Sequence, residues 1–350
     1  MICDTFDNPA DMYFRMVRDI AAARRRVYLE MYIFIPDRYG ILLRDAFTDA
    51  AKRGVEVKIL LDSWGTDIRA DFFRDTVRHG GEIRIFRQLR LSPKVLKQHH
   101  RRNHRKLLVV DDSIFYIGSA NISEVESSWW QLSARIEDGN SGLAEAFLDS
   151  FNLYNRHFHS VKKRIIPIKG DGYTILRDVP SLRHQRIRAQ LLWMIRKAKE
   201  RIFIESPYFI PDLKFFAALR QAAKRGTHVT IIVPKHSDVR MADFLANSYL
   251  GLLHKAGIHI YLYNPRTLHA KCIMADNQVM FGTANFNYRS FVHQYEMMLI
   301  SRNRYLVDQV AGHFEKGLKS SEAFDYRKWK TRPPLNKFLG RALHPFRQFI

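Results

Sequence analysis

The sequence repeats itself once over most of its length, and this repeat restricts the possible folds more than any other feature. Residues 30–37, Glu-Met-Tyr-Ile-Phe-Ile-Pro-Asp, match residues 205–212, Glu-Ser-Pro-Tyr-Phe-Ile-Pro-Asp. The two copies stay in nearly constant register as far as Asn121 and Asn285, so one copy spans close to half of the chain. Solenoid repeats have periods of about 20 to 50 residues, so this much longer period indicates duplication of a whole folding unit.

Each copy alternates helices with strands. In the first copy, hydrophobic periodicity and chain breakers predict helices at 12–26 and 40–52 and strands at 27–34 and 55–62. In the second copy they predict helices at 182–199 and 211–224 and strands at 201–209 and 227–233. This alternation is typical of the α/β class, and two α-β-α halves related by a pseudo-two-fold axis are expected.

The repeat divides the chain into two halves and a tail. We expect a first half over 1–160, a second half over 161–318 and a basic amphipathic tail over 319–350. Because the segment between the copies is short, the halves should pack tightly. No stretch approaches the roughly 18 consecutive apolar residues of a membrane span, and the acidic N-terminus is unlike a secretory signal.

The charge balance predicts a polyanionic partner. The chain has 57 Lys and Arg against 35 Asp and Glu, a formal net charge of +22, and nine Lys or Arg without an acid lie between Ile83 and Val110. Nucleic acid and anionic lipid both attract such a protein. Cys3 and Cys272 form neither a disulfide framework nor a metal-binding spacing, which fits a reducing, cytoplasmic setting.

A His-x-Lys-x4-Asp signature, followed by Gly-Ser/Thr-Ala-Asn, occurs once in each copy. Its members are His104, Lys106, Asp111, Ser119 and Asn121 in the first copy and His269, Lys271, Asp276, Thr283 and Asn285 in the second. On an extended strand the His and Lys of each pair project to the same side, as a two-point phosphate contact requires. Gly118 and Gly282 are expected to permit a turn that returns the Ser/Thr and Asn side chains to the same site, with Ser119 and Thr283 binding substrate.

These residue types suit phosphodiester chemistry without a metal or cofactor. A neutral imidazole can attack phosphorus and form a covalent intermediate, which splits one difficult displacement into two. Lysines and asparagines stabilise charge on the non-bridging oxygens, and the second histidine protonates the departing alkoxide and later deprotonates the incoming alcohol or water. A single such pair can arise by chance on a surface, but two at matching places of a duplicated fold are a much stronger signal.

The paired signature resembles that of the phospholipase D superfamily, and the match covers nearly the whole chain. Several phrases are similar to bacterial cardiolipin synthases in particular: Tyr-Ile-Phe at 32–34, Ala-Ala-Lys-Arg-Gly-Val at 50–55, Arg-Asn-His-Arg-Lys at 102–106, Pro-Tyr-Phe-Ile-Pro at 207–211 and Arg-Ser-Phe at 289–291. The resemblance implies a duplicated phospholipase D-type fold with one active site at the interface of the halves. It also implies that His104 is the nucleophile and His269 the general acid and base.

The superfamily also places an acidic residue after each motif to orient the partner histidine. Glu296 fits this place in the second half, whereas the first half has Gln131. A glutamine can accept a hydrogen bond from imidazole but cannot stabilise imidazolium as a carboxylate does, so the two histidines should differ in basicity. The signature places Asp111 and Asp276 in the candidate catalytic set, but a turn-capping role is the stronger expectation for both.

Two other groups beside the signature could be reactive or bind metal. Strand alternation turns Cys272 away from Lys271, so we expect this cysteine in the core. His99 and His100 lie in a run of arginines and lysines that would oppose a divalent ion, so the run is interpreted as a phosphate-attracting loop and no metal site is predicted.

The tail interleaves apolar and basic residues from Arg332 to Ile350, a pattern that suits an interfacial segment on an anionic membrane. A C-terminal helix docked on the core would have the same pattern. The membrane is favoured because the cardiolipin synthases that the chain resembles act on lipids. We therefore expect peripheral attachment to the cytoplasmic side of the cell membrane, and a monomer, because one chain carries both motifs.

Phosphatidyl transfer is the preferred function. A phosphatidyl group from phosphatidylglycerol would pass through a phosphatidyl-histidine to a second phospholipid and give cardiolipin, with ping-pong kinetics. The same site could instead use water, as a phospholipase D that releases phosphatidic acid or as a nuclease, which the positive charge leaves open. The choice of acceptor depends on the shape of the site. A non-catalytic binding protein is not expected to retain both His-Lys pairs.

Overall fold

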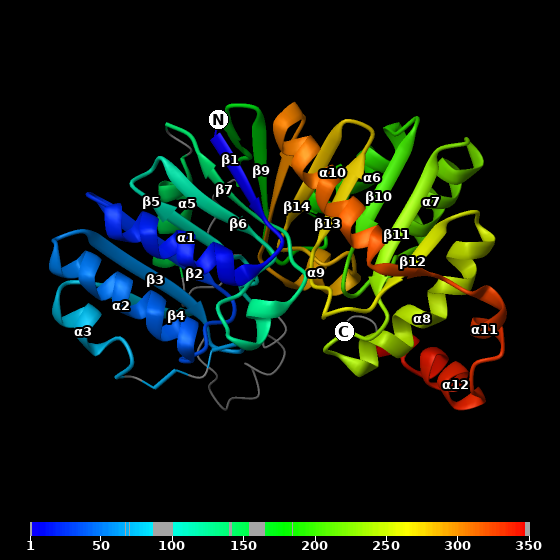
Figure 1. The fold of residues 1–350 in the computed structure, drawn as a ribbon, viewed down its shortest axis with the longest axis horizontal. Coiled ribbons are helices and arrows are strands. Elements are labelled where there is room, and N and C mark those ends of the chain that lie inside the picture. Colours follow the sequence, from blue (N-terminus) through cyan, green and yellow to red (C-terminus); the bar gives the residue numbers. More distant parts are fainter. Residues whose placement is uncertain are drawn as a thin grey trace.

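Two mixed β-sheets, one in each copy of the repeat, form the framework of the molecule (Figure 1). The structure is a computed structural model that describes residues 2–66, 68–69, 71–86, 101–139, 142–153, 165–183 and 185–346. The predicted boundary near residue 160 and the histidines His99 and His100 lie outside these ranges.

The first sheet has the strand order β1-β7-β6-β5-β2-β3-β4. Its strands are β1 (Ile2–Phe6), β2 (Arg26–Met31), β3 (Glu56–Asp62), β4 (Glu82–Phe86), β5 (Leu107–Val110), β6 (Ile114–Gly118) and β7 (Ser133–Glu137). The second sheet has the order β16-β12-β11-β10-β13-β14-β15-β9-β8. Its strands are β8 (Ile168–Gly170), β9 (Tyr173–Asp178), β10 (Arg201–Glu205), β11 (His228–Pro234), β12 (His259–Tyr263), β13 (Cys272–Ala275), β14 (Gln278–Gly282), β15 (Glu296–Ser301) and β16 (Ser321–Ala323).

The two sheets have the same topology. From β9 to β12 the second sheet repeats the first strand for strand, and β8 and β16 extend its two edges. β2 pairs parallel with β3 and antiparallel with β5, and β10 pairs in the same way with β11 and β13. The duplicated α/β architecture predicted from the repeat is therefore confirmed.

Helices cover the outer faces of both sheets (Figure 1). On the first sheet these are α1 (Pro9–Ala22), α2 (Arg38–Lys52) and α3 (Arg74–Arg78), and on the second α6 (Arg186–Lys197), α7 (Leu213–Lys224) and α8 (Arg240–Lys255). The inner faces are covered in part by α5 (Leu143–Asn152) and α10 (Arg304–Lys319). The other helical segments are η1 (Val125–Ser128), α9 (Tyr288–His293), α11 (Tyr326–Lys330), α12 (Pro334–Ala342) and η3 (His344–Phe346).

The matching phrases of the repeat fix the ends of equivalent helices. Asp37 caps α2 and Asp212 caps α7, each accepting a backbone N–H, at 3.1 Å and 2.9 Å. Gly54 and Gly226 follow the last turns of these helices with φ of 83° and 87°, a left-handed conformation that glycine adopts without strain. All eight predicted elements are present, although the predicted strands 27–34 and 201–209 end early, at Met31 and Glu205.

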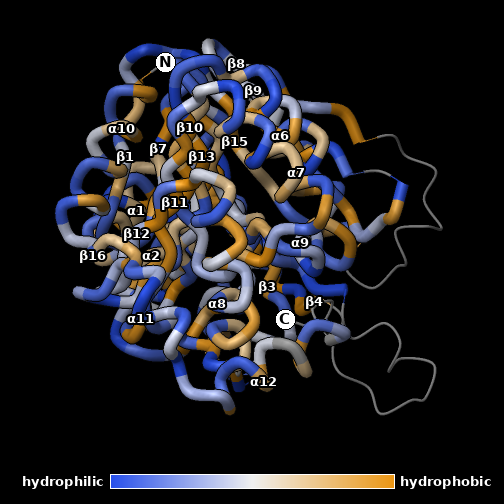
Figure 2. The backbone as a smooth tube through the Cα atoms, turned by 90° about the vertical axis from the view of Figure 1, so that its right-hand side faces the viewer, coloured by the Kyte–Doolittle hydropathy of each residue, from blue (hydrophilic) through white to orange (hydrophobic). Residues whose placement is uncertain are grey.

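The main hydrophobic core lies between the two sheets and takes residues from both. Leu107 and Val109 of β5 and Cys272 and Met274 of β13 all belong to it. Alternate residues of the same strands face the outer helices and form a separate core in each half. Figure 2 shows β10, β11 and β13 as hydrophobic segments running through the interior. Because the core between the sheets contains residues from both halves, the two halves form one packed unit.

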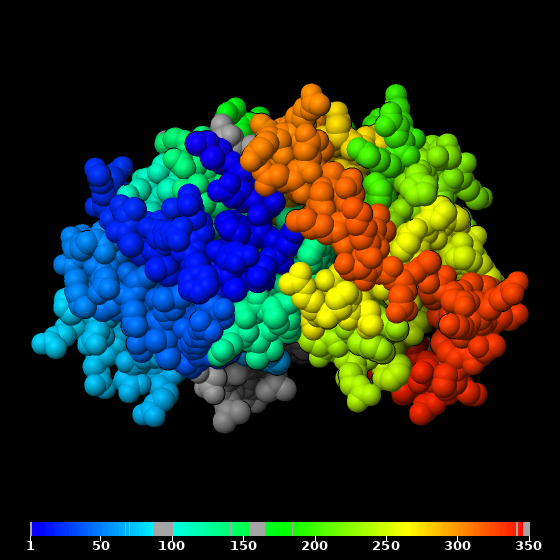
Figure 3. Space-filling model, in the orientation of Figure 1, coloured from blue at the N-terminus to red at the C-terminus, as the bar shows by residue number. Residues whose placement is uncertain are grey.

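The N-terminal segment lies against α10 of the second half, where the two meet on the surface in Figure 3. Gln309 of α10 accepts from the N–H of Thr5 at 2.9 Å and donates to the Cys3 carbonyl at 3.0 Å. Lys316, further along the helix, donates to Asp7 at 2.8 Å. These polar contacts add to the shared core in joining the two halves.

The predicted tail does not stand apart from the second half. Its first residues form β16, which pairs with β12, and its helices α11 and α12 pack against α8. Trp329 donates from Nε1 to the Asn247 carbonyl at 2.8 Å, and its ring lies so close to Gly251 that a Cβ there would approach to 2.1 Å. The docked-helix alternative is therefore present, while Leu335 and Phe338 remain exposed on α12. None of the helices within the described ranges combines the length and the apolar character that spanning a bilayer requires.

Candidate active site at the interface of the two halves

Each signature histidine reaches its place through a backbone bridge to the other half. The N–H of His104 donates to the Tyr295 carbonyl at 3.0 Å, and the N–H of His269 donates to the Trp130 carbonyl at 2.8 Å. Each His-Lys pair lies just before its strand, since β5 begins at Leu107 and β13 at Cys272. The prediction that the pairs lie within a strand is therefore wrong. The extended geometry comes from pairing between the halves.

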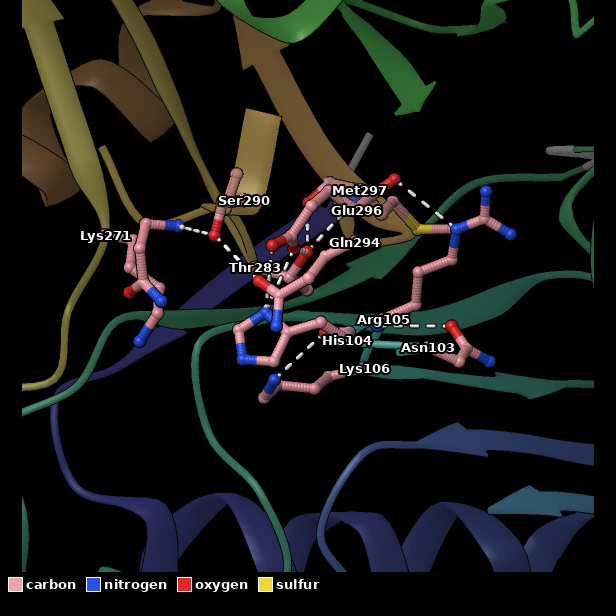
Figure 4. A network of polar contacts seen from close by, with 12 residues as sticks. Asn103, His104, Arg105, Lys106, Lys271, Thr283, Ser290, Gln294, Glu296 and Met297 are labelled. Atoms are coloured by element: carbon pink, nitrogen blue, oxygen red, sulfur yellow. Dashed lines mark hydrogen bonds and ion pairs between the residues drawn. The ribbon is translucent and has the colours of Figure 1, made fainter. Parts of the chain in front are cut away.

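The side chain that orients each histidine also comes from the opposite half. Nδ1 of His104 lies 3.1 Å from both carboxylate oxygens of Glu296, which points toward the ring in Figure 4. Nδ1 of His269 lies 3.0 Å from Oε1 of Gln131. An acceptor at Nδ1 keeps the proton of a neutral imidazole on that nitrogen, so Nε2 carries the lone pair. Glu296 and Gln131 thus occupy the places that the sequence assigned to them.

The two signature lysines are fully buried beside the histidines. Nζ of Lys106 donates to the His104 carbonyl at 3.0 Å, and Nζ of Lys271 donates to the His269 carbonyl at 2.8 Å. Each ammonium has three donors, and these contacts use one. The lysines therefore brace the histidine backbone and retain donors for an anion.

Burial shifts all four groups toward their neutral forms. It lowers the pKa of His104 and of His269 well below the ordinary value, and the charges of the neighbouring lysines lower both further. Burial also lowers the pKa of Lys106 to about 8 and the pKa of Lys271 well below its ordinary range. Near neutral pH both imidazoles are therefore unprotonated, and a bound anion would offset the repulsion among the buried cations.

Both histidines open into one cavity of about 700 Å³. Asn121 and Asn285 lie in its wall beside them, and Oδ1 of Asn285 has no hydrogen-bond partner among the described residues. Tyr32 stands edge-on to His104, with ring centroids 4.7 Å apart, and Trp129 stands edge-on to His269 at 5.3 Å. Much of the remaining wall is apolar: Ile33, Trp64, Val239, Met241, Ala242 and Leu343.

Sequence comparison places this site in a known family. The family model described as "Cardiolipin synthase, PLD-like domain" matches residues 16–134 and 191–318. The chain is 31% identical to the major cardiolipin synthase ClsA of Bacillus subtilis over 98% of this chain and 74% of that protein. It is 32% identical to a cardiolipin synthase of Clostridium perfringens over 97% of this chain and 77% of that one.

The chain belongs to the cardiolipin synthase family of the phospholipase D superfamily. It is an enzyme of that superfamily, as its paired signature predicted.

Two solved structures share the fold of this chain. Phosphatidylserine synthase of Haemophilus influenzae superposes with a TM-score of 0.77 at 14% identity, over 99% of this chain and 95% of that one. Polyphosphate kinase of Porphyromonas gingivalis superposes with a TM-score of 0.63 at 13% identity, over 99% of this chain and 53% of that one. At such identities the likeness concerns the fold alone, and it confirms the predicted fold class.

Glu126 is a buried member of this family site that the sequence did not reveal. Both of its carboxylate oxygens accept from Nδ2 of Asn121, at 2.8 and 3.0 Å, and one accepts from Nε2 of Gln131 at 3.1 Å. Burial raises the pKa of Glu126, which the amide hydrogen bonds and the signature lysines partly offset. The second copy has Ser290 and no acid at the matching place, so the repeat itself gives no signal for a carboxylate here.

The hydroxyls of Ser119 and Thr283 are used to hold the strands together, so no contact among the described residues supports their predicted role in substrate binding. Ser119 exchanges hydrogen bonds with the backbone of Leu132, at 3.1 and 3.2 Å. Thr283 donates to Glu296 and accepts from the N–H of Met297 at 2.9 Å. Thr283 therefore supports the carboxylate that orients a histidine, while burial raises the pKa of that carboxylate to about 7.

The glycines before these residues serve close packing and do not form the predicted turn. Gly118 and Gly282 end β6 and β14. A Cβ on Gly118 would lie 2.4 Å from Cα of Ser133, and one on Gly282 would lie 2.4 Å from the Met297 carbonyl oxygen. The absent side chains let the neighbouring strand, which leads to Gln131 or Glu296, approach the motif.

Asp111 and Asp276 lie at the far ends of β5 and β13, away from the histidines. Asp276 accepts the N–H groups of residues 199, 200 and 201 at 2.9, 2.9 and 3.0 Å, and Asp111 does the same for residues 24 to 26 at 2.7 to 3.0 Å. Burial would raise the pKa of Asp276, but these backbone donors lower it. The two aspartates therefore fasten the helix-to-strand turn of each half, which agrees with the turn-capping role that the sequence favoured for them. The same contacts explain why the predicted helix 12–26 ends at Ala22.

One group of possible metal ligands lies elsewhere among the described residues. Ligand atoms of Glu205, Cys272 and His313 lie within 4.8 Å of one another. Both nitrogens of His313 are engaged, however, Nδ1 with Asp7 at 2.6 Å and Nε2 with Glu205 at 2.7 Å. Burial would lower the pKa of His313, but the carboxylates raise it well above its ordinary value, so the ring donates from both nitrogens to Asp7 and Glu205. Cys272 lies in the core as predicted, and burial raises the pKa of its thiol to about 12.

We expect Asp276→Asn to lower stability without changing the turnover of the folded enzyme. The amide keeps one acceptor oxygen but turns an NH2 toward backbone donors, so the free energy of unfolding should fall by about 1–2 kcal/mol. Urea unfolding and hydrolysis of bis(p-nitrophenyl) phosphate per folded molecule measure the two effects, with Asp308→Asn, exposed on α10, as the control. Lost turnover at unchanged stability would return Asp276 to the catalytic set.

Proposed function

We propose that this enzyme makes cardiolipin by moving a phosphatidyl group from phosphatidylglycerol to the headgroup hydroxyl of a second phospholipid. The general activity, phosphatidyl transfer between phospholipids, is supported by membership of the family. The observation that carries the finer proposal is the pair of crossed contacts, Glu296 on His104 and Gln131 on His269, beside one cavity with an apolar wall. That wall suits acyl chains better than a nucleic-acid backbone, which a charged groove would track.

In the first step, Nε2 of His104 attacks phosphorus and the bond to the glycerol oxygen breaks. Glu296 accepts the Nδ1–H of His104 and stabilises the positive charge that develops on this ring as the N–P bond forms. Lys106 and Lys271 offset the charge on the non-bridging oxygens. The product is a phosphatidyl-histidine.

His269 acts as acid in this step and as base in the next. The anionic phosphodiester raises the affinity of the neighbouring imidazole for a proton, so His269 enters the reaction protonated and gives that proton to the leaving glycerol. Its contact at Nδ1 is the neutral amide of Gln131, so the imidazolium is a stronger acid than one paired with a carboxylate. The neutral ring then takes the proton of the incoming hydroxyl, which attacks phosphorus and releases His104.

An apolar rim around the cavity mouth would place the site against a membrane. Trp64 and Met241, both in the cavity wall, are 55% and 53% exposed. Next to α8, which carries Met241, α12 exposes Leu335 and Phe338, which lie on the same side of the helix and are each 64% exposed. Figure 1 shows α8 and α12 along the same edge of the molecule. The net charge of +22 would add attraction to anionic lipid.

Peripheral attachment to the cytoplasmic face of the cell membrane completes the proposal. The two cysteines, Cys3 and Cys272, are free and buried, which suits a reducing compartment. A monomer suffices, because one chain supplies both histidines and both orienting side chains.

With vesicles of phosphatidylglycerol labelled in both headgroup and acyl chains, we expect labelled cardiolipin and free glycerol. His104→Ala should give neither product, since no nucleophile remains, and the exposed His259→Ala should match the parent enzyme. Thin-layer chromatography separates cardiolipin from phosphatidic acid. Phosphatidic acid as the sole lipid product would replace the transferase by a phospholipase D, and cleavage of added DNA with no lipid product would replace it by a nuclease.

Leu335→Ser combined with Phe338→Ser should weaken binding to phosphatidylglycerol vesicles by at least about tenfold, because both side chains lose apolar area that the membrane would bury. Co-sedimentation with vesicles measures the partition coefficient. The matched control is Ile2→Ser combined with Tyr305→Ser, at residues 62% and 60% exposed on β1 and α10. Equal losses in both double variants, or none in the first, would remove the rim from the proposal.

A further inference from the structure

The first half holds a carboxylate in the cavity wall that the reaction above does not use. Glu126 is 5% exposed, and its hydrogen bonds go to the side-chain amides of Asn121 and Gln131. The second of these amides is the contact of His269. Glu126 therefore reaches the histidine through one intervening side chain.

The repeat shows that the carboxylate occupies different places in the two halves. The register that aligns His104 with His269 also aligns Gln131 with Glu296, and it brings Glu126 to within one position of Ser290. The second half thus has the hydroxyl of Ser290 at the position that corresponds to Glu126, and the carboxylate of Glu296 in contact with His104. The first half has the carboxylate of Glu126 one side chain away from the histidine, and the amide of Gln131 in contact with His269. Each half therefore contributes one buried acid to this network, but only Glu296 contacts a signature histidine directly.

The amide of Gln131 has two possible orientations, with opposite effects on His269. With Oε1 toward the ring it accepts the Nδ1–H, and Nε2 is then free to transfer protons. With its NH2 toward the ring it would require a lone pair on Nδ1, and the neutral imidazole would then carry its proton on Nε2. Both oxygens of Glu126 accept from amide NH2 groups, so the carboxylate holds the NH2 of Gln131, at 3.1 Å, and leaves Oε1 of the same amide toward His269, at 3.0 Å.

We propose that Glu126 is a positioning residue that fixes the orientation of the Gln131 amide and thereby holds neutral His269 as the Nδ1–H tautomer. Nε2 of His269 then faces the cavity ready to exchange a proton. Asn121, which lies in the cavity wall, is held by the same carboxylate, so one buried acid orders two neighbouring side chains. The inference builds on the role proposed for His269, but the tautomer itself is a property of the protein without substrate.

The test compares Glu126→Gln with the double variant Glu126→Gln/Gln131→Glu in protein labelled with ¹⁵N-histidine. The ¹⁵N shifts of His269, assigned by their loss in His269→Asn, report its tautomer without any substrate. We expect the Nδ1–H form in the parent protein, a mixture in Glu126→Gln, and the Nδ1–H form again in the double variant. In that variant the carboxylate contacts the histidine directly, as Glu296 does in the other half. Glu124→Gln, an exposed neighbour in the chain, is the control and should match the parent.

Turnover should follow the tautomer. Amidation of a carboxylate bonded directly to a catalytic histidine lowers kcat by roughly 10⁴-fold, and one residue further away we expect a loss on the order of 100-fold in kcat with KM little changed. The double variant should recover to within about tenfold of the parent. An unchanged tautomer in Glu126→Gln would overturn the proposal, as would a folded double variant with the same mixed tautomer as the single one. Absence of a lipid product in every protein would count against the proposed function and leave the tautomer result standing.

Discussion

Two hydrogen bonds that cross between the halves determine how this site works. Glu296 of the second half orients His104 of the first, and Gln131 of the first half orients His269 of the second. Beside each of these contacts, the backbone N–H of the histidine also donates to a carbonyl of the other half. Neither half therefore contains a complete site, and the packing of the two sheets against one core becomes a condition for the chemistry. The large shared core and the contacts of α10 with the N-terminal segment supply that packing.

Burial gives this arrangement its electrostatic character. Two lysines and two histidines lie together out of water, and their pKa values are all lowered. Placing like charges in a buried site is unfavourable until an anion enters, so binding of a phosphodiester and charge relief are the same event. The two acids beside the histidines are placed differently: Glu296 contacts His104 directly, whereas Glu126 contacts the amide of Gln131, which in turn contacts His269. A symmetric fold thus gives the two histidines different surroundings, as the proposed roles of nucleophile and proton carrier require.

The sequence predicted the parts of this account that depend on spacing along the chain. The repeat predicted a duplicated α/β fold, the signature predicted the His-Lys pairs, and the resemblance to the superfamily predicted the places of Glu296 and Gln131. It misassigned Ser119 and Thr283, whose hydroxyls bond within their own half, because spacing does not say which way a side chain turns. It missed Glu126 because only the folded η1 segment brings this acid against Asn121 and Gln131. The sequence could not predict the docking of α12 on α8, because an amphipathic helix has the same pattern of residues whether it packs on protein or on a membrane.

A crystal structure of the protein with vanadate tests the shared site most directly, because this ion adopts the geometry of a phosphoryl group under attack. The account predicts one vanadate per chain, bonded to Nε2 of one signature histidine, with Nε2 of the other in hydrogen-bond contact with an oxygen on the opposite side. The lysines and Asn121 or Asn285 would contact its remaining oxygens. Two separate ions, one in each half, or an ion that contacts a single histidine would contradict the account.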